Sequence, residues 1–292
     1  MKAIIPAAGQ GTRFLPASKA VPKEMLPVLD RPAIQYVVEE ALAADASEVI
    51  IICNDDKPEI FQHFAPNHNL ELSLEQKGKA ALAASVRHAG NLPVSFAQQP
   101  KPLGLGNAVH CAAELMDNDT QGFYVLLGDV LVPEGDLLKR MHAVSAEHGN
   151  ASVIAVISVA PEEVSRFGII DGELVSGTQQ DGTAVWQIKA MVEKPALADA
   201  PSTLAIFGRY LLSPAVMQIL AHTAPGAGGE IQLTDALVEL LNTEKMYAVE
   251  VGPTEGFDCG TVADWLTTNL ILAARDTELS EAVKAACDKI TW

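Results

Sequence analysis

A short segment near the start of the chain combines small residues with two cations. The apolar run Ala3–Ile5 ends at Pro6 and leads into residues 7–13, AAGQGTR. Small residues let the backbone approach a ligand closely, and glycines accept positive φ angles that other residues resist. Lys23 lies ten residues beyond Arg13. Backbone N–H groups around an anion, with two cations to neutralise it, would make this segment a phosphate-binding loop.

The glycines by themselves do not identify the ligand, because a tight turn after a first strand also uses them. The dinucleotide-binding fingerprint needs a third glycine where this chain has Phe14, which counts against a nicotinamide or flavin site. The Walker pattern also fails, since no Gly-Lys-Ser/Thr follows at the required distance.

Two aspartates follow predicted strands, at positions where chemistry is expected. Asp129 follows the apolar run 125–128, and ligands of open α/β sheets gather at the carboxyl ends of strands. A strand-terminal aspartate can instead cap a helix, but residues 130–132 are apolar and begin no helix. Asp258 likewise comes after a predicted strand, at 247–251.

The predicted elements place these residues on an α/β sheet. Runs at 3–5 and 49–53 are predicted to be buried strands, with a helix between them that starts near Asp30 as N-cap. Strand, helix and strand at this spacing predict a parallel sheet with helices on its faces. After Ala151 the pattern changes to strands at 152–159 and 185–192, with a hairpin over 167–175. This half is predicted to extend the sheet in antiparallel or mixed fashion.

Composition narrows the function classes. The 292 residues carry a formal charge of −17, which argues against a nucleic-acid partner, and nearly half of them are hydrophobic. The four cysteines are widely separated and form no CxxC pair, as expected for reduced thiols in the cytoplasm. We find no signal peptide and no apolar run long enough for a bilayer, so we expect no membrane partner.

Residues 6–28, PAAGQGTRFLPASKAVPKEMLPV, closely resemble the N-terminal signature of bacterial UTP–glucose-1-phosphate uridylyltransferases, within the sugar-nucleotidyltransferase superfamily. The segment GAGGEIQLTD at 226–235 resembles the same group, as do Phe167-Gly168 and the tripeptide Glu193-Lys194-Pro195. Without this context, a Glu-Lys pair is usually a solvated surface pair. The likeness extends over residues 2–275.

The resemblance implies a Rossmann-like mixed, mainly parallel central sheet with helices on both faces and a β-rich sugar-binding extension. We expect one domain over 1–292, with a nucleotide-binding half at 1–150 and a sugar-phosphate half at 151–261. The helical segment 262–292 would pack on its own sheet or on a neighbouring subunit. A homo-oligomer, dimer or tetramer, is expected.

The resemblance also implies the reaction and its residues. UTP and glucose 1-phosphate would give UDP-glucose and pyrophosphate, with Mg²⁺ held by Asp129 and Asp258. The implied catalytic residues are Arg13, Lys23, Asp129, Lys194 and Asp258. The implied nucleotide-binding residues are Ala7, Ala8, Gly9, Gly11, Thr12, Glu24, Gln99 and Gly104. The implied sugar-binding residues are Gly168, Glu193, Lys194 and Glu230.

Three departures leave alternatives open. Many relatives carry a proline or a second aspartate where this chain has Gly128 and Val130. Thr261 stands where uridylyltransferases usually carry asparagine, and the thymidylyltransferase branch typically has threonine there. A glucose-1-phosphate thymidylyltransferase is therefore one alternative. A non-catalytic paralogue that binds sugar nucleotides is another, although the residues whose loss would mark it are present: Arg13, Lys23, Asp129 and Asp258.

Overall fold

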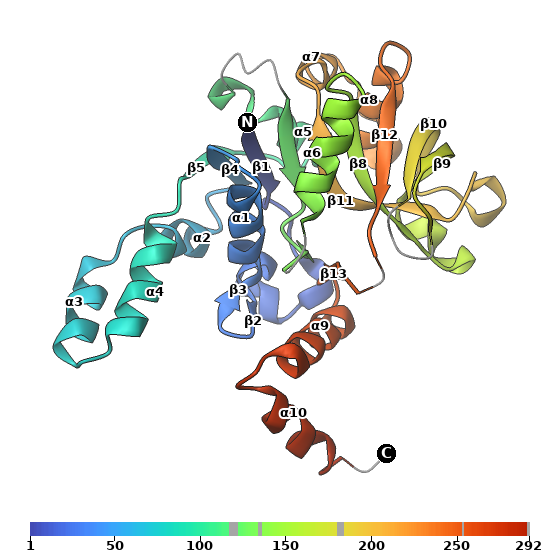
Figure 1. Cartoon of the computed structure of the whole chain (residues 1–292). Helices are drawn as coiled ribbons and strands as arrows, with labels where there is room; N and C mark the ends of the chain where they lie inside the picture. Colours follow the sequence, from blue (N-terminus) through green and yellow to red (C-terminus); the bar gives the residue numbers. More distant parts are fainter. Residues whose placement is uncertain (117–121, 134–135, 180–183, 253, 291–292) are drawn as a thin grey trace.

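Four strands in the first half of the chain form a parallel part of a nine-stranded sheet, in which β1, β4 and β6 are buried and the edge strand β5 is only partly buried. The computed structural model describes residues 1–116, 122–133, 136–179, 184–252 and 254–290 (Figure 1). Parallel pairing joins neighbours in the order β5-β4-β1-β6. The bounds are β1 Lys2–Pro6, β4 Glu48–Cys53, β5 Val94–Gln98 and β6 Phe123–Leu126. The strands predicted at 3–5 and 49–53 are confirmed.

The second half of the chain continues the same sheet in the order β11-β8-β12-β10-β9. Only β8 and β12 pair in parallel there. Antiparallel pairing joins β11 to β6, β8 and β9, and joins β10 to β12 and β9. The bounds are β8 Ser152–Ser158, β9 Gly168–Ser176, β10 Val185–Glu193, β11 Leu204–Leu212 and β12 Met246–Glu250. The sheet is therefore mixed, and parallel pairing prevails only in its first half.

The hairpin predicted over 167–175 is wrong, because this segment is the single strand β9, paired with β10. Asp171-Gly172 has the composition of a turn, but Gly172 lies in the strand opposite Ile188. A Cβ at Gly172 would lie 2.9 Å from the carbonyl oxygen of Gln187. Glycine therefore serves a close approach between strands rather than a turn.

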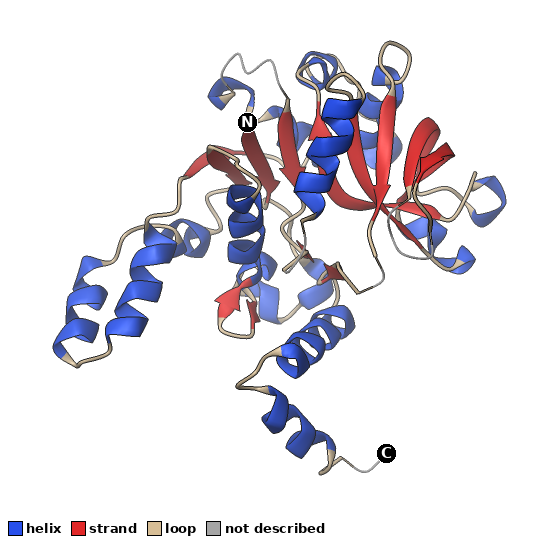
Figure 2. Cartoon of the chain, in the orientation of Figure 1, coloured by secondary structure: helices blue, strands red, loops and turns tan. Residues whose placement is uncertain are grey.

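Helices cover both faces of the sheet, as the secondary-structure view in Figure 2 illustrates. Adjacent strand residues such as Ile4 and Ile5 belong to different apolar clusters, because side chains alternate along a strand. Helices α1 (Ala33–Ala43) and α6 (Leu137–Glu147) pack on the face of Ile5. The opposite face is covered by α5 (Leu105–His110), α7 (Ala215–Leu220) and α8 (Leu233–Leu240).

Two helical segments project from this body (Figure 1). One is the helix pair α3 (His68–Gln76) and α4 (Ala80–Gly90), preceded by α2 (Pro58–His63). The other is formed by α9 (Val262–Arg275) and α10 (Ser280–Cys287), where α10 packs on α9. None of the helices in the described ranges is long and apolar enough to cross a membrane.

Short two-stranded sheets anchor the loops near the sheet's edge. Strand β2 (Pro27–Val28) pairs with β3 (Arg31–Pro32), and α9 packs against β2 and against β13 (Phe257–Asp258). Helix α1 starts after Pro32, which makes no side-chain cap, so the predicted N-cap role of Asp30 is wrong. The β2–β3 pairing holds the residues before the helix in extended form instead.

Candidate active site

The loops after β1, β5 and β6 meet around a cavity of about 530 Å³. These strands run parallel, so their carboxyl ends lie at one edge of the sheet. Predicted site residues that line the cavity are Ala8, Gly9, Gly11, Thr12, Arg13, Lys23, Glu24, Gln99, Gly104, Asp129 and Glu230. Predicted site residues outside this lining are Ala7, Gly168, Glu193, Lys194 and Asp258.

The glycine-rich loop after β1 is held in place from both sides. Gly11 has φ 63° and precedes the short 3₁₀ helix Thr12–Phe14, a conformation that glycine adopts without strain. Its carbonyl accepts a hydrogen bond from Ser18 Oγ at 2.7 Å. On the other side, the buried Lys57 Nζ donates to the carbonyl oxygen of Ala7 at 2.5 Å and to Glu24 Oε2 at 3.0 Å.

Glu24 lies beneath the loop rather than open to solvent, since only 2% of it is exposed. Burial raises the pKa of its carboxyl, while the cations Lys57 and Lys23 act in the opposite direction. The carboxylate is therefore paired with Lys57. The sequence analysis did not predict a role for Lys57. Lys57 follows the polar residues 54–56 after β4, where no spacing distinguishes it from a surface lysine.

Lys23 and Asp129 form an ion pair inside the cavity, with Nζ 2.5 Å from Oδ2. Burial alone would raise the pKa of Asp129, but the neighbouring ammonium of Lys23 and the guanidinium of Arg13 outweigh it and lower that pKa. Burial would lower the pKa of Lys23, and the carboxylates of Asp129 and Glu24 raise it instead. Both groups are therefore held in their charged forms.

Asp258 is brought next to Asp129 by a short strand pairing. In β7 (Val130–Leu131) and β13, Val130 lies opposite Asp258. The N–H of Cys259 donates to the carbonyl of Asp129 at 2.7 Å, and the N–H of Gly260 donates to Asp258 Oδ1 at 2.7 Å. Burial raises the pKa of Asp258; the Gly260 hydrogen bond opposes this and Asp129 adds to it.

Gly260 marks the point where three charged groups converge. A Cβ at this position would lie 2.8 Å from Asp258 Oδ1, 3.5 Å from Asp129 Oδ2 and 3.3 Å from Arg13 Nη1. Any side chain would fill the space between the two carboxylates and the guanidinium. The absence of a side chain at this glycine therefore keeps the site open to a ligand.

Asp129 and Asp258 fit a hard divalent cation that takes most of its ligands from water and substrate. Within the described part of the chain, no group of three or more His, Cys, Asp or Glu side chains could hold a metal ion. The two carboxylates at Gly260 are the available oxygen donors. Mg²⁺ is commonly held by one or two carboxylates together with substrate phosphates and water, so Asp129 and Asp258 fit it.

Gln99 lies on the side of the cavity away from the carboxylates, immediately after β5. Its amide Nε2 donates to the carbonyl of Gly104 at 3.0 Å and to Asn107 Oδ1 at 2.9 Å. These bonds use both amide hydrogens, so the amide oxygen is the group available to a ligand. The surrounding segment is tied down because Ile231 N–H donates to Leu103 O at 2.7 Å. This contact also brings Glu230 beside Gly104, where a Cβ would lie 2.9 Å from that of Glu230.

Glu193, Gly168 and Thr234 form a second polar cluster. Thr234 Oγ1 donates to Glu193 Oε2 at 2.7 Å, and a Cβ at Gly168 would lie 3.1 Å from the same oxygen. Lys194 has the left-handed φ of 45°, and its N–H donates to the carbonyl of Phe167 at 3.0 Å. Its Nζ lies 3.2 Å from Glu193 Oε1, and 55% of its side chain is exposed. The sequence analysis did not predict this contact of Thr234.

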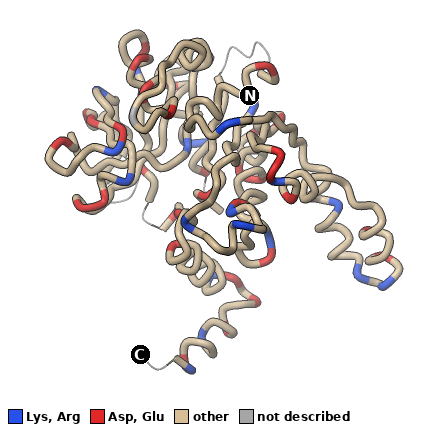
Figure 3. Tube along the Cα trace, turned by 180° about the vertical axis from the view of Figure 1, so that it is seen from behind, with Lys and Arg blue, Asp and Glu red and all other residues tan. Residues whose placement is uncertain are grey.

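The cavity carries positively charged side chains although the chain as a whole is acidic. Figure 3 shows Asp and Glu distributed along both halves of the molecule, consistent with the formal charge of −17. Arg13 and Lys23 line the cavity, and Lys57 lies beneath its glycine-rich loop. An anionic ligand would be attracted here rather than to the surface in general.

Comparisons with known proteins agree with this geometry. The family described as "Nucleotidyl transferase" matches residues 2–275. A UTP–glucose-1-phosphate uridylyltransferase from Bacillus subtilis (strain 168) is 43% identical over 283 residues, covering 96% of this chain and 93% of that protein. The protein of the same name from Streptococcus pneumoniae is 41% identical over 288 residues, covering 97% and 93%.

Solved structures lead to the same group. A UTP-bound UGPase from Acinetobacter baumannii has a TM-score of 0.87 at 37% identity, with 99% of each chain covered. A UDP-glucose pyrophosphorylase in complex with UDP-glucose has a TM-score of 0.80 at 36% identity, with 94% of this chain and 99% of that one covered. The chain therefore belongs to the nucleotidyl transferase family, and its relatives there are UTP–glucose-1-phosphate uridylyltransferases.

Proposed function

We propose that this protein transfers a uridylyl group from UTP to glucose 1-phosphate, giving UDP-glucose and pyrophosphate. The observation that carries the proposal is the convergence of Arg13, Asp129 and Asp258 around Gly260, at the edge of a nucleotide-sized cavity. The names of the relatives support the choice of substrates.

The reaction needs no protein nucleophile, because the sugar phosphate is already ionised. One of its phosphate oxygens attacks the α-phosphorus of UTP, and the bond from that phosphorus to the bridging oxygen of pyrophosphate breaks. Catalysis then consists of holding the two anions in line and neutralising charge as it develops.

Each cation has a distinct proposed task. Arg13 holds the departing pyrophosphate. Lys23 contacts the α-phosphate region, for which its ammonium moves from Asp129 toward the nucleotide. Lys194 holds the attacking phosphate, and its partly exposed side chain leaves it free to reach that group. A cation of this kind that acts mainly in the transition state is worth about 3 kcal/mol, or about 100-fold in rate.

We propose that a divalent metal, Mg²⁺, is held by Asp129 and Asp258. When bound, it would neutralise and orient the oxygens of the triphosphate. The lowered pKa of Asp129 keeps this carboxylate ionised, and the hydrogen bond from Gly260 orients that of Asp258.

The remaining residues position the substrates. The backbone of Ala8, Gly9, Gly11 and Thr12 surrounds the phosphates, and Ala7 and Glu24 hold that loop in place through Lys57. The amide oxygen of Gln99 accepts from the N–H of uracil, and Gly104 leaves room for the ring. Gly168, Glu193 and Glu230 contact the sugar, with Glu193 accepting from its hydroxyls.

The threonine that suggested a thymidylyltransferase has a local structural task. Thr261 is the N-cap of α9, where its Oγ1 accepts from the N–H of Asp264 at 3.2 Å and donates to Asp264 Oδ2 at 2.7 Å. A capping threonine carries no information about the base. The names of the relatives, rather than this residue, favour the uridylyl donor.

Both halves of the chain contribute to one site. Glu230 and Gly260, from the second half, line the same cavity as Gln99. We propose that residues 1–292 act as one catalytic domain, in which 1–150 contribute most of the nucleotide contacts and 151–261 the sugar-phosphate contacts.

We also propose that the protein forms a homo-oligomer, a dimer or tetramer, through its C-terminal helices. Val262, Leu266 and Leu270 occupy one face of α9 and are 54%, 52% and 49% exposed. A second copy would bury them. Light scattering should give a mass of two or four chains, and a monomer at micromolar concentration would contradict this proposal.

Pyrophosphate release tests the reaction directly. The protein with Mg²⁺ is supplied with UTP, dTTP, CTP, GTP or ATP, each combined with the 1-phosphates of glucose, galactose and N-acetylglucosamine. We expect the highest kcat/KM for UTP with glucose 1-phosphate. Higher kcat/KM with dTTP would assign the thymidylyl reaction, and no release from any pair would favour a non-catalytic paralogue.

A further inference from the structure

Arg209 is a charged side chain buried in the centre of the sheet. It lies on β11 and is 0% exposed. Its guanidinium faces Glu40 of α1, with Nε 2.9 Å from Oε1 and Nη2 2.6 Å from Oε2. This is the paired, fork-like geometry that arginine forms with a carboxylate. The two residues are 169 positions apart, so the tertiary fold alone brings them together.

The rest of the guanidinium binds the turn that carries Asp129. Nη2 donates to the carbonyl of Val130 at 2.7 Å, and Nη1 donates to that of Leu127 at 3.2 Å. Leu127 and Val130 lie on either side of Asp129, and the N–H of Val130 bonds to Leu127 O at 3.3 Å. Arg209 therefore contacts both ends of this turn without reaching the cavity itself.

Stability alone does not account for this arrangement. Desolvating two charges is costly, and apolar residues of similar volume often replace a buried ion pair with no loss of stability. A lysine would retain the charge but could not bind a carboxylate and two separate carbonyls in one plane. The Arg209–Glu40 pair also fixes the positions of the carbonyl oxygens of Leu127 and Val130.

We infer that Arg209 and Glu40 are positioning residues that hold the Leu127–Val130 turn so that Asp129 faces Asp258 and Arg13. The inference rests on the function proposed above for Asp129. Glu40 orients the guanidinium, the guanidinium fixes the two carbonyls, and the turn then directs the Asp129 side chain. A shift of about 1 Å at a reacting centre can cost about 100-fold in rate, so small errors in this turn matter.

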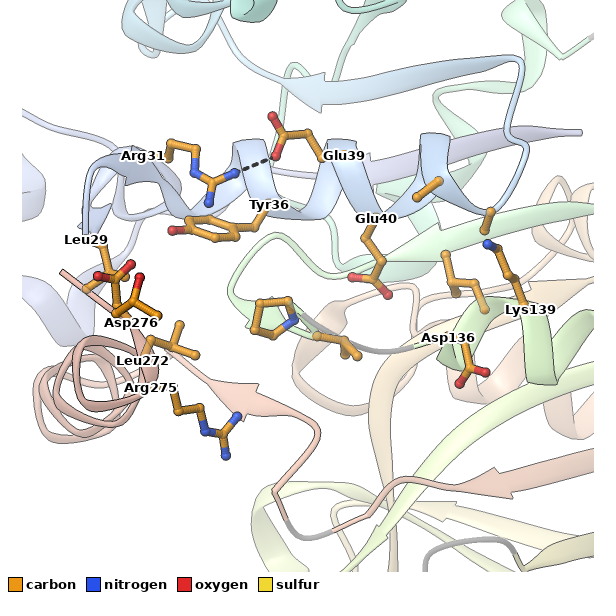
Figure 4. A pocket seen from close by; sticks show the side chains of 16 residues that line it. Leu29, Arg31, Tyr36, Glu39, Glu40, Asp136, Lys139, Leu272, Arg275 and Asp276 are labelled. Atoms are coloured by element: carbon orange, nitrogen blue, oxygen red, sulfur yellow. Dashed lines mark hydrogen bonds and ion pairs between the residues drawn. The ribbon is translucent and has the colours of Figure 1, made fainter. Parts of the chain in front are cut away.

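The neighbouring Glu39 offers a matched control. Figure 4 shows Glu39 and Glu40 on the same helix, at the wall of a cavity of about 560 Å³. Glu39 pairs with Arg31 at 3.0 Å and makes no contact with Arg209 among the described residues, whereas Glu40 is linked to the Asp129 turn. The same substitution at the two positions therefore separates loss of charge on α1 from loss of the Arg209 contact.

The experiment compares Arg209→Lys, Glu40→Gln and the control Glu39→Gln in the full chain. We expect Arg209→Lys and Glu40→Gln to lower kcat by about 10- to 100-fold, while KM for glucose 1-phosphate changes less than about threefold. The dissociation constant of Mn²⁺ with UTP, measured by electron paramagnetic resonance without sugar phosphate, should rise at least about fivefold. Glu39→Gln should leave all three quantities near wild type.

A purely structural role predicts a different result. It would lower the urea midpoint of Arg209→Lys and Glu40→Gln while folded protein retained wild-type kcat and Mn²⁺ affinity, and that outcome overturns the inference. If Arg209→Lys does not fold, Glu40→Gln decides alone. Wild-type protein that releases no pyrophosphate would instead contradict the proposed function, and the wild-type measurement separates the two failures.

Discussion

Lys23 Nζ lies 2.5 Å from Asp129 Oδ2, although 106 residues separate the two in the chain. The cation proposed for the α-phosphate and the carboxylate proposed for the metal are therefore partners in this structure. Each neutralises the other in a partly buried site, with 22% of each side chain exposed. In the proposed mechanism, substrate binding exchanges this pair for a metal on the carboxylate and a phosphate on the ammonium.

Replacement of Asp129 tests the metal side of this exchange. We expect Asp129→Asn to lower kcat by at least about 100-fold, because an amide cannot supply the negative charge that a divalent cation needs. Circular dichroism should show that the fold persists. Asp171→Asn, at an exposed position of β9, is the control and should retain wild-type turnover. Full activity in Asp129→Asn would refute the role of this residue.

Removal of Lys194 tests the sugar-phosphate side. We expect Lys194→Ala to lower kcat by about 100-fold and to raise KM for glucose 1-phosphate more than KM for UTP. The reason is that its ammonium, next to Glu193, is proposed to hold the attacking phosphate. Lys189→Ala removes a lysine of β10 that pairs with Glu173 of the neighbouring strand β9, and it should have little effect. A larger change in KM for UTP would place Lys194 elsewhere.

Gly104 is predicted to be intolerant of any side chain. It has φ 102° and ψ 173°, a region that is essentially restricted to glycine, and a Cβ would lie 2.7 Å from the carbonyl of Ile231. We expect Gly104→Ala to raise KM for UTP at least about tenfold, and to lower the free energy of unfolding by about 1–3 kcal/mol. Gly78→Ala is the control, since φ is also positive there but no atom lies within 4 Å. Equal effects on KM would contradict a special role for Gly104.

Asp258 should set the acid limb of the pH profile. Burial and the nearby Asp129 raise its pKa above the ordinary value of 3.8, whereas that of Asp129 is lowered. Asp258 is therefore protonated first as the pH falls, and a proton competes with the metal for this carboxylate. Pyrophosphate release measured against pH should show an acid limb that moves to lower pH at higher Mg²⁺. An acid limb independent of Mg²⁺ would exclude this assignment.

The same pKa shifts predict opposite effects on stability. The raised pKa of Asp258 stabilises the fold below the ordinary value, and this contribution is lost as the pH rises through the raised value. For Asp129 the contribution is present above the ordinary value and is lost as the pH falls through the lowered one. At neutral pH, urea unfolding should therefore show that Asp258→Asn is more stable than wild type and Asp129→Asn less stable. The reverse order would contradict both shifts.

Much of the chemistry could be predicted from local sequence. Residues 7–13, Gln99 and Asp129 follow the strands β1, β5 and β6, and the carboxyl ends of parallel strands meet at one edge. Strand runs and glycine-rich loops are properties of a few consecutive residues. For that reason, the glycine-rich loop after β1 and the edge of the sheet that carries the cavity could be predicted without coordinates.

Other relationships were decided by the tertiary structure. The predicted elements include no strand at 204–212, yet β11 joins the two halves of the sheet and carries Arg209. The approach of Asp258 to Asp129 depends on the β7–β13 pairing. Lys57 contacts Ala7 and Glu24, which are distant from it in the chain. These contacts join segments that are far apart in the chain and form only when the whole core packs. They form because packing of the core buries groups from distant segments next to one another. No local pattern of residue types encodes which groups will meet.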